Sequence, residues 1–146
     1  MNLDNKNKLK LTNCLCTSLR KSSRNITQIY NKYLKESGEN INANQVSILV
    51  AISQINNGTL TKISEQLKME RTTLTRNLNI LKKSGWVKSN SGSDGRFRYI
   101  ELTTKGNNVL TKIFPHWELA QKQVKKILGE EIDSFKKNLK KISANL

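Results

Sequence analysis

Cysteine and histidine are scarce, since the 146-residue sequence contains only Cys14, Cys16 and His116. Two cysteines two positions apart on a helix point in different directions, so no disulfide bond between them is expected. Two thiols and one imidazole about a hundred residues away do not have the spacing of zinc ligands. The sequence therefore predicts neither a disulfide framework nor a metal site.

Long apolar runs are also missing. No stretch approaches the roughly 20 apolar residues of a membrane-spanning helix. The segment from Met1 to Leu11 is polar and charged, where a signal peptide would be apolar. We therefore expect a soluble, cytoplasmic protein with no membrane partner. Because no nucleophile, base and orienting group occur in a recognisable grouping, and no Gly-rich phosphate loop occurs, neither enzyme activity nor a cofactor is expected.

Acidic residues are few. The chain has 26 Lys and Arg against 11 Asp and Glu, which gives a formal net charge of +15. A polyanion is the simplest partner for such a surface. Bulk charge is unspecific, however, because Lys and Asn are abundant throughout and compositional bias can supply part of the excess.

The spacing of apolar residues predicts a mainly α-helical chain with one small β-hairpin. The expected elements are a long helix over 11–36, a helix capped by Asn42 or Asn44, a short helix capped by Thr59, a helix from Arg71 to about Ser84, two strands between Trp86 and Leu102, a long helix after Thr103 or Thr104 that is kinked near Pro115, and a last helix after Gly129. A short helix, a three-residue break from Lys68 to Glu70 and a longer helix form the helix-turn-helix pattern.

The predicted organisation is a single domain over 1–146, with a DNA-binding lobe over 42–102. The helices over 11–36 and 104–146 lie outside that lobe and carry apolar stripes that a small monomer has little surface to cover. We therefore expect these helices to form a homodimer. The alternative is a monomeric bundle in which the two ends pack on each other.

The helix that follows the break has two distinct faces. Leu74, Leu78 and Leu81 share the inward face. The outward side carries Thr72, Arg76, Asn79 and Lys83, with Thr73 and Thr75 on its flanks. Almost no acid interrupts this side, although solvent-exposed helices usually pair Glu with Lys. A guanidinium can bind a guanine edge bidentately, and the hydroxyls and amide suit adenine, thymine or phosphate, so this face favours groove reading over simple solvation.

The hairpin tip contains Asp94-Gly95-Arg96. Asp suits the turn and could hold Arg side chains by charge-assisted hydrogen bonds, while Gly permits a positive backbone angle. A projected Arg96 could enter a narrow minor groove, where the potential is most negative. The alternative is a surface hairpin with a local ion pair.

Four segments together resemble the MarR family of bacterial regulators: Met69 to Leu78, Leu81 to Val87, Asp94 to Arg96, and Leu102 to Gly106. The resemblance implies a winged helix-turn-helix with N- and C-terminal dimerisation helices, reading helices in successive major grooves of double-stranded DNA, and wings in the minor grooves. It further implies that Thr72, Thr73, Thr75 and Arg76 contact bases or phosphates, and that Asp94 and Arg96 order the wing and contact DNA. Glu70 departs from the family, which usually has a better helix-capping residue there.

The first helix is similar to that of the organic-hydroperoxide-sensing branch, in which a cysteine at the position of Cys16 is oxidised. Tyr30 matches one of the tyrosines that surround that cysteine, but Arg20 and Ala43 replace the other two. Arg20, one turn from Cys16, could instead lower the pKa of the thiol. The alternative is that both cysteines are small buried apolar residues in a dimerising helix.

These patterns favour a regulator, most simply a repressor, that binds a pseudo-palindromic operator as a homodimer and is released by a small-molecule effector or an oxidant. Two alternatives remain at this stage. One is an architectural protein that coats DNA through charge alone. The other is a cysteine-based redox sensor that uses Cys16.

Overall fold

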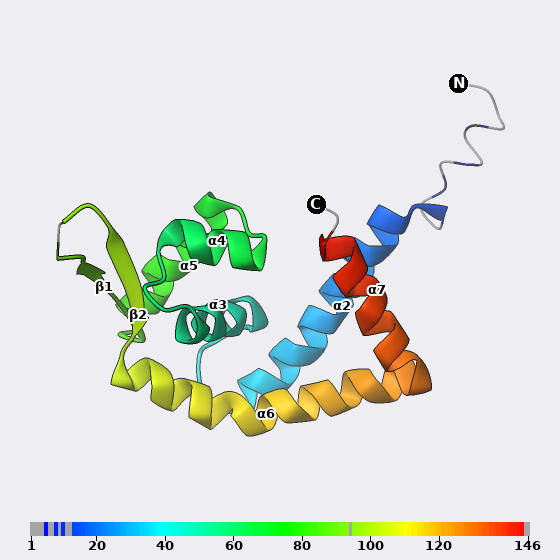
Figure 1. Cartoon of the computed structure of the whole chain (residues 1–146). Coiled ribbons are helices and arrows are strands. Elements are labelled where there is room, and N and C mark those ends of the chain that lie inside the picture. Colours follow the sequence, from blue (N-terminus) through cyan, green and yellow to red (C-terminus); the bar gives the residue numbers. More distant parts are fainter. Residues whose placement is uncertain (1–4, 6–7, 9, 11–12, 94, 145–146) are drawn as a thin grey trace.

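The structure, a computed structural model, describes residues 5, 8, 10, 13–93 and 95–144. Its elements are α2 (Leu15–Lys35), α3 (Ala43–Gln54), α4 (Leu60–Leu67), α5 (Arg71–Lys83), β1 (Val87–Ser91), β2 (Arg98–Leu102), α6 (Thr104–Leu128), the short 3-10 helix η2 (Gly129–Glu131) and α7 (Ile132–Ala144). In Figure 1, α6 runs along the base of the molecule. The lobe of α3, α4, α5 and the hairpin stands over one end of α6, and α2 and α7 rise over the other.

Local capping sets where the helices begin. Asn42, one of the two predicted caps, begins α3, and it exchanges hydrogen bonds with Gln45 at 3.0 and 3.1 Å in a capping box. Thr59 caps α4 by accepting a hydrogen bond from the Lys62 N–H at 3.3 Å. Thr103, rather than Thr104, caps α6 by accepting from the Gly106 N–H at 3.0 Å. Each cap satisfies an amide that the helix itself leaves without a partner.

The predicted helix-turn-helix is present as α4, a short break and α5. Lys68 ends α4 in the left-handed conformation, with φ of 49°. After α5, Gly85 takes a φ of +74°, as expected of the residue that follows the last turn. One core holds the lobe together, and its fully buried side chains come from α2 to α6: Leu34, Ile48, Leu49, Ile63, Leu74, Leu81 and Ile113.

The hairpin is fixed to the rest of the lobe at two places. Strands β1 and β2 pair in antiparallel fashion from Val87↔Leu102 to Ser91↔Arg98. On its other side, β2 is held by a 2.8 Å hydrogen bond from the Ile100 N–H to the Gly58 carbonyl. At the base of the hairpin, the Thr103 hydroxyl donates to the Gly85 carbonyl at 2.6 Å. The hairpin therefore cannot swing freely relative to α5 and α6.

The helix α6 continues from Thr104 to Leu128 with Pro115 inside it. The sequence predicts a kink near Pro115, because proline has no N–H to donate to the preceding turn. Figure 1 shows instead one continuous, gently bowed helix. The helix thus accommodates the missing hydrogen bond by curving gently, and it is not broken at Pro115.

Apolar side chains remain uncovered on the helices outside the lobe. Leu15 on α2 is 81% exposed, and Ile127 on α6 is 63% exposed. The last helix, α7, buries none of its residues.

Within the described residues, no helix is long and apolar enough to cross a membrane.

Candidate nucleic-acid interface

The two faces of α5 match the sequence prediction. Its buried residues are Leu74, Leu78 and Leu81, which fasten it to the core. The side chains predicted to read DNA are all exposed: Thr72, Thr73, Thr75, Arg76, Asn79 and Lys83. Among the residues that the structure describes, no acidic group forms an ion pair with Arg76 or Lys83. The face is therefore polar, weakly basic and open to a partner.

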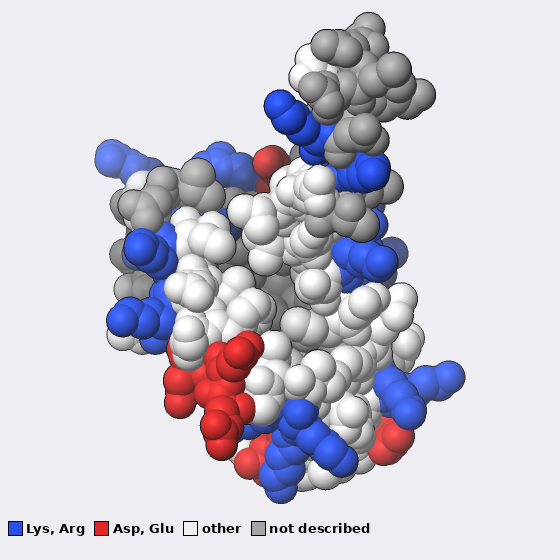
Figure 2. Space-filling model, turned by 90° about the vertical axis from the view of Figure 1, so that its right-hand side faces the viewer, with Lys and Arg blue, Asp and Glu red and all other residues white. Residues whose placement is uncertain are grey.

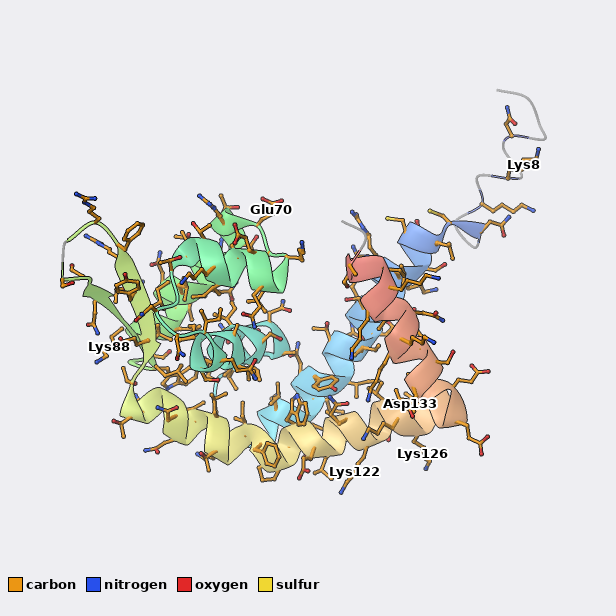
Figure 3. The ribbon with its side chains drawn as sticks, viewed as in Figure 1. Lys8, Glu70, Lys88, Lys122, Lys126 and Asp133 are labelled. Carbon is orange, nitrogen blue, oxygen red and sulfur yellow. The ribbon has the colours of Figure 1, made fainter. Side chains whose placement is uncertain are left out.

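Hydrogen bonds from α4 to α5 and to the turn between them fix the orientation of α5. The Arg71 guanidinium donates to the Thr61 hydroxyl at 3.0 Å. The Ser64 hydroxyl donates to the Met69 carbonyl at 2.8 Å. Glu70 occupies the N-cap position of α5 but makes no capping hydrogen bond with its side chain. Figure 3 shows Glu70 on the turn between the two helices. The first amides of α5 are thus left available to an acceptor such as phosphate.

At the hairpin tip, Gly95 has a φ of +69°, the positive angle that the turn was expected to need. The Gly95 N–H donates to the Gly92 carbonyl at 2.9 Å, and the Gly92 N–H donates to the Phe97 carbonyl at 2.8 Å. Arg96 is exposed beside this turn. Asp94 lies outside the described residues, so its predicted role in ordering the wing stays a prediction.

Two basic residues near α5 were not singled out from the sequence. Lys82 is exposed in the last turn of α5, and Arg98 is exposed at the start of β2. Alternate residues of a strand lie on the same face, so the sequence could have placed Arg98 on the same face of β2 as buried Ile100. On the opposite face, Glu101 forms an ion pair with Lys88 at 3.5 Å.

The cysteines of α2 are both exposed in the single chain. The alternative that both are buried in a dimerising helix concerns the dimer, so it stays a prediction. Cys14 is the N-cap of α2. Hydrogen bonding to the side chain of Thr17, and then to its backbone, lowers the pKa of the Cys14 thiol. Nearby hydrogen-bond donors favour the thiolate.

Tyr30 is not near Cys16 within one chain. Fourteen residues along the same helix separate them by about 21 Å at 1.5 Å per residue. Tyr30 instead lines a cavity of about 330 Å³ between α2, α3 and α6, together with Ile26, Leu34, Val46 and Trp117. Burial raises the pKa of the Tyr30 hydroxyl, which favours its protonated, hydrogen-bond-donating form. The cavity is within the size range of small-molecule sites, roughly 300–1,000 Å³.

Comparison with known proteins agrees with this geometry. The sequence profile of the MarR family matches residues 41–96. The M. tuberculosis transcriptional regulator MosR, solved in complex with DNA, is 32% identical over 90% of this chain and 95% of that chain, with a TM-score of 0.79. A search of curated protein sequences gives no significant match.

Two more distant structures share the fold. The transcriptional repressor CouR, solved with a 23-mer DNA duplex, has a TM-score of 0.81 and 17% identity, over 93% of this chain and 96% of that chain. S. aureus MepR, solved with DNA, has a TM-score of 0.76 and 20% identity, over 91% of this chain and 98% of that chain.

A helix-turn-helix with an exposed, acid-poor second helix and an adjacent β-hairpin defines a DNA-binding transcriptional regulator of the winged helix-turn-helix class. The chain belongs to the MarR family. The predicted fold class, mainly α-helical with a small hairpin wing, is confirmed.

Proposed function

We propose that the chain is a repressor that binds a pseudo-palindromic operator as a homodimer. The observation that carries this proposal is the open polar face of α5, backed by three buried leucines and fixed by its contacts with α4. Its proposed DNA-contacting residues are Thr72, Thr73, Thr75, Arg76, Asn79 and Lys83, with Asp94 and Arg96 in the wing. The solved DNA complex of MosR, which is 32% identical, supports this assignment.

The geometry suits both grooves of B-DNA. An α-helix fits the major groove, where each base pair presents a distinct pattern of donors and acceptors. The exposed guanidinium of Arg76 suits a guanine edge, and the threonine hydroxyls suit bases or phosphates. The hairpin stands beside α5 and can place Arg96 in the adjacent minor groove, where a narrow groove attracts arginine.

A footprint over host genomic fragments tests sequence-specific binding. We expect a discrete, symmetric protected site, with half-sites about one helical turn apart, because a two-fold dimer presents two reading helices. The rival function is an architectural protein that coats DNA through its charge of +15. Uniform protection of all fragments would contradict the repressor and support the coating protein.

The proposed dimer uses the ends of the chain, α2, α6 and α7, while residues 42–102 form the DNA-binding lobe. Besides Leu15 and Ile127, these helices expose the apolar side chains of Leu19, Leu139 and Ile142. Figure 2 shows the face at this end of the molecule, where uncharged residues surround a hollow and charged residues gather at the margins. Because α7 buries none of its own residues, a monomeric bundle closed by the two ends is disfavoured.

Replacing Ile127 with glutamate should dissociate the proposed dimer. A charge in a desolvated apolar interface costs several kcal/mol, so we expect mostly monomer at micromolar concentration. Analytical ultracentrifugation measures the change. The matched control is Lys122→Glu on the same helix, where Figure 3 shows Lys122 pointing away from α2 and α7. If the Ile127 variant sediments like the wild type, α6 does not form the interface.

Oxidant-controlled release is a second candidate function, favoured by the exposed thiols of α2 and the lowered pKa of Cys14. The resemblance points to Cys16 as the sensor. We expect mild peroxide to weaken operator binding of the wild type by about 5–150-fold, the usual range of allosteric coupling.

The variants Cys16→Ser and Cys14→Ser separate the two thiols. We expect Cys16→Ser to keep its operator affinity after peroxide, and Cys14→Ser to respond like the wild type. Identical responses in all three proteins would remove Cys16 as the sensor. The cavity beside Tyr30 would then be the remaining candidate site for an effector.

A further inference from the structure

A small groove lies between the second helix of the helix-turn-helix and the hairpin. Its volume is about 160 Å³. The residues that line it come from α4, α5 and the two strands: Leu60, Thr75, Leu78, Asn79, Lys82, Ser89, Arg98 and Ile100. Leu60, Leu78 and Ile100 are wholly or partly buried, so they form its floor, and the polar residues form its walls.

The wall residues face each other because of two periodicities. Thr75, Asn79 and Lys82 are spaced four and three residues apart, so they form one stripe of α5. On the hairpin, Arg98 lies on the same face of β2 as Ile100, and Ser89 pairs with Ile100 across the strands. The hairpin register thus directs Ser89 and Arg98 toward α5.

The groove is positively charged. Two cations, Lys82 and Arg98, line it, and no acidic residue does. Both are exposed, and neither side chain has an ion pair or hydrogen bond within the part of the chain that the structure describes. By contrast, Lys88 on the opposite face of the same hairpin is paired with Glu101 at 3.5 Å. The unpaired side chains of Lys82 and Arg98 therefore lie where α5 and the hairpin face each other.

The size of the groove limits its ligand. At about 160 Å³ it is smaller than a typical metabolite site. It has room for roughly five waters at about 30 Å³ each, which also suits one small anionic group. Hydroxyl and amide groups of Thr75, Asn79 and Ser89 add hydrogen-bond donors beside the two cations. A phosphate group matches both this volume and this donor set.

We propose that this groove holds the phosphates of the DNA strand that separates the major groove from the minor groove. The inference rests on the proposed function, in which α5 lies in the major groove and the hairpin lies in the neighbouring minor groove. The sugar–phosphate strand that borders both grooves then passes between α5 and β2. From the hairpin side, the planar guanidinium of Arg98 donates hydrogen bonds to a phosphate. From the helix side, the ammonium group of Lys82 neutralises the phosphate charge.

The salt dependence of DNA binding tests this site, because each neutralised phosphate releases counterions. The probe is a fluorescent duplex of arbitrary sequence and about 30 base pairs, roughly three helical turns. Its binding is followed by anisotropy over a range of KCl concentrations. Because the proposed dimer carries two copies of the groove, we expect the slope of log K against log salt to flatten by about 1.8 for Arg98→Gln and for Lys82→Gln, with about a 60-fold loss of affinity at 0.1 M salt.

Two further variants sharpen the test. Arg98→Lys should keep most of the slope, because it retains the charge. Lys88→Gln, on the opposite face of the hairpin, should bind like the wild type. Thermal unfolding should be unchanged for all of them, since these side chains are exposed.

Salt-dependent binding by the wild type, with unchanged slopes in Arg98→Gln and Lys82→Gln, would overturn the phosphate groove alone. A wild type whose DNA binding shows no salt dependence would overturn the proposed function and this inference together.

Discussion

Replacing Arg76 with alanine should weaken binding to the operator by about 1–3 kcal/mol and relax the preference at one base position. Arg76 is exposed on α5, on the side opposite the buried Leu74 and Leu78. Its guanidinium can bind two acceptors of one guanine, and alanine leaves both without a donor. Titration against operators altered at single positions measures both the affinity and the selectivity.

Lys83→Ala is the matched control at the end of the same helix. A lysine that contacts only phosphate should lower the affinity for all sequences alike and reduce the salt slope by about 1 per subunit. Unchanged affinity and selectivity in both variants would show that α5 is not the reading helix.

Gly106→Ala should destabilise the protein by about 3 kcal/mol, the upper end of the usual cost of overpacking. Helix propensity alone predicts the opposite sign, a gain of about 1 kcal/mol, because Gly106 lies in α6. A Cβ at this position would overlap the backbone carbonyl of Trp86. Backbone cannot rotate away as a flexible side chain can, so the overlap outweighs the propensity. Urea unfolding measures the difference.

Asn108→Ala, two residues further along α6, is the control for this effect. Asn108 is exposed, so alanine there should leave stability unchanged or raise it by up to about 0.7 kcal/mol. Equal stability of the two variants would mean that α6 does not approach the hairpin base so closely in solution.

The sequence predicts features of the fold that depend on neighbouring residues. Helix starts at Thr59 and Thr103 follow from side chains that reach amides three residues away. The choice of Asn42 over Asn44 depends on Gln45, which completes the capping box, and the reciprocal pattern was present in the sequence. The approach of Gly106 to Trp86 left no such signal, because the two residues meet only once the hairpin has formed.

The candidate site also has parts that follow from neighbouring residues and parts that depend on the folded chain. The outward face of α5 follows from helical periodicity, so Arg76 and its neighbours could be predicted. The groove at Lys82 and Arg98 depends on how the hairpin is placed beside α5, which no local pattern encodes. The cavity beside Tyr30 likewise needs three helices to come together. Exposure of Cys16 could not be predicted either, because it depends on which surfaces the chain itself covers.

The bowed helix α6 joins the hairpin to the end of the molecule that forms the proposed dimer. Its 25 residues span about 38 Å at 1.5 Å per residue, with the hairpin attached near one end and Ile127 near the other. A tilt of about 5° at the Ile127 end would move the opposite end by roughly 3 Å, close to the rise of one base pair, about 3.4 Å. In the proposed dimer, a ligand between α2, α3 and α6 that tilts α6 only slightly would therefore change the distance between the two reading helices, so that they no longer match the spacing of the operator half-sites.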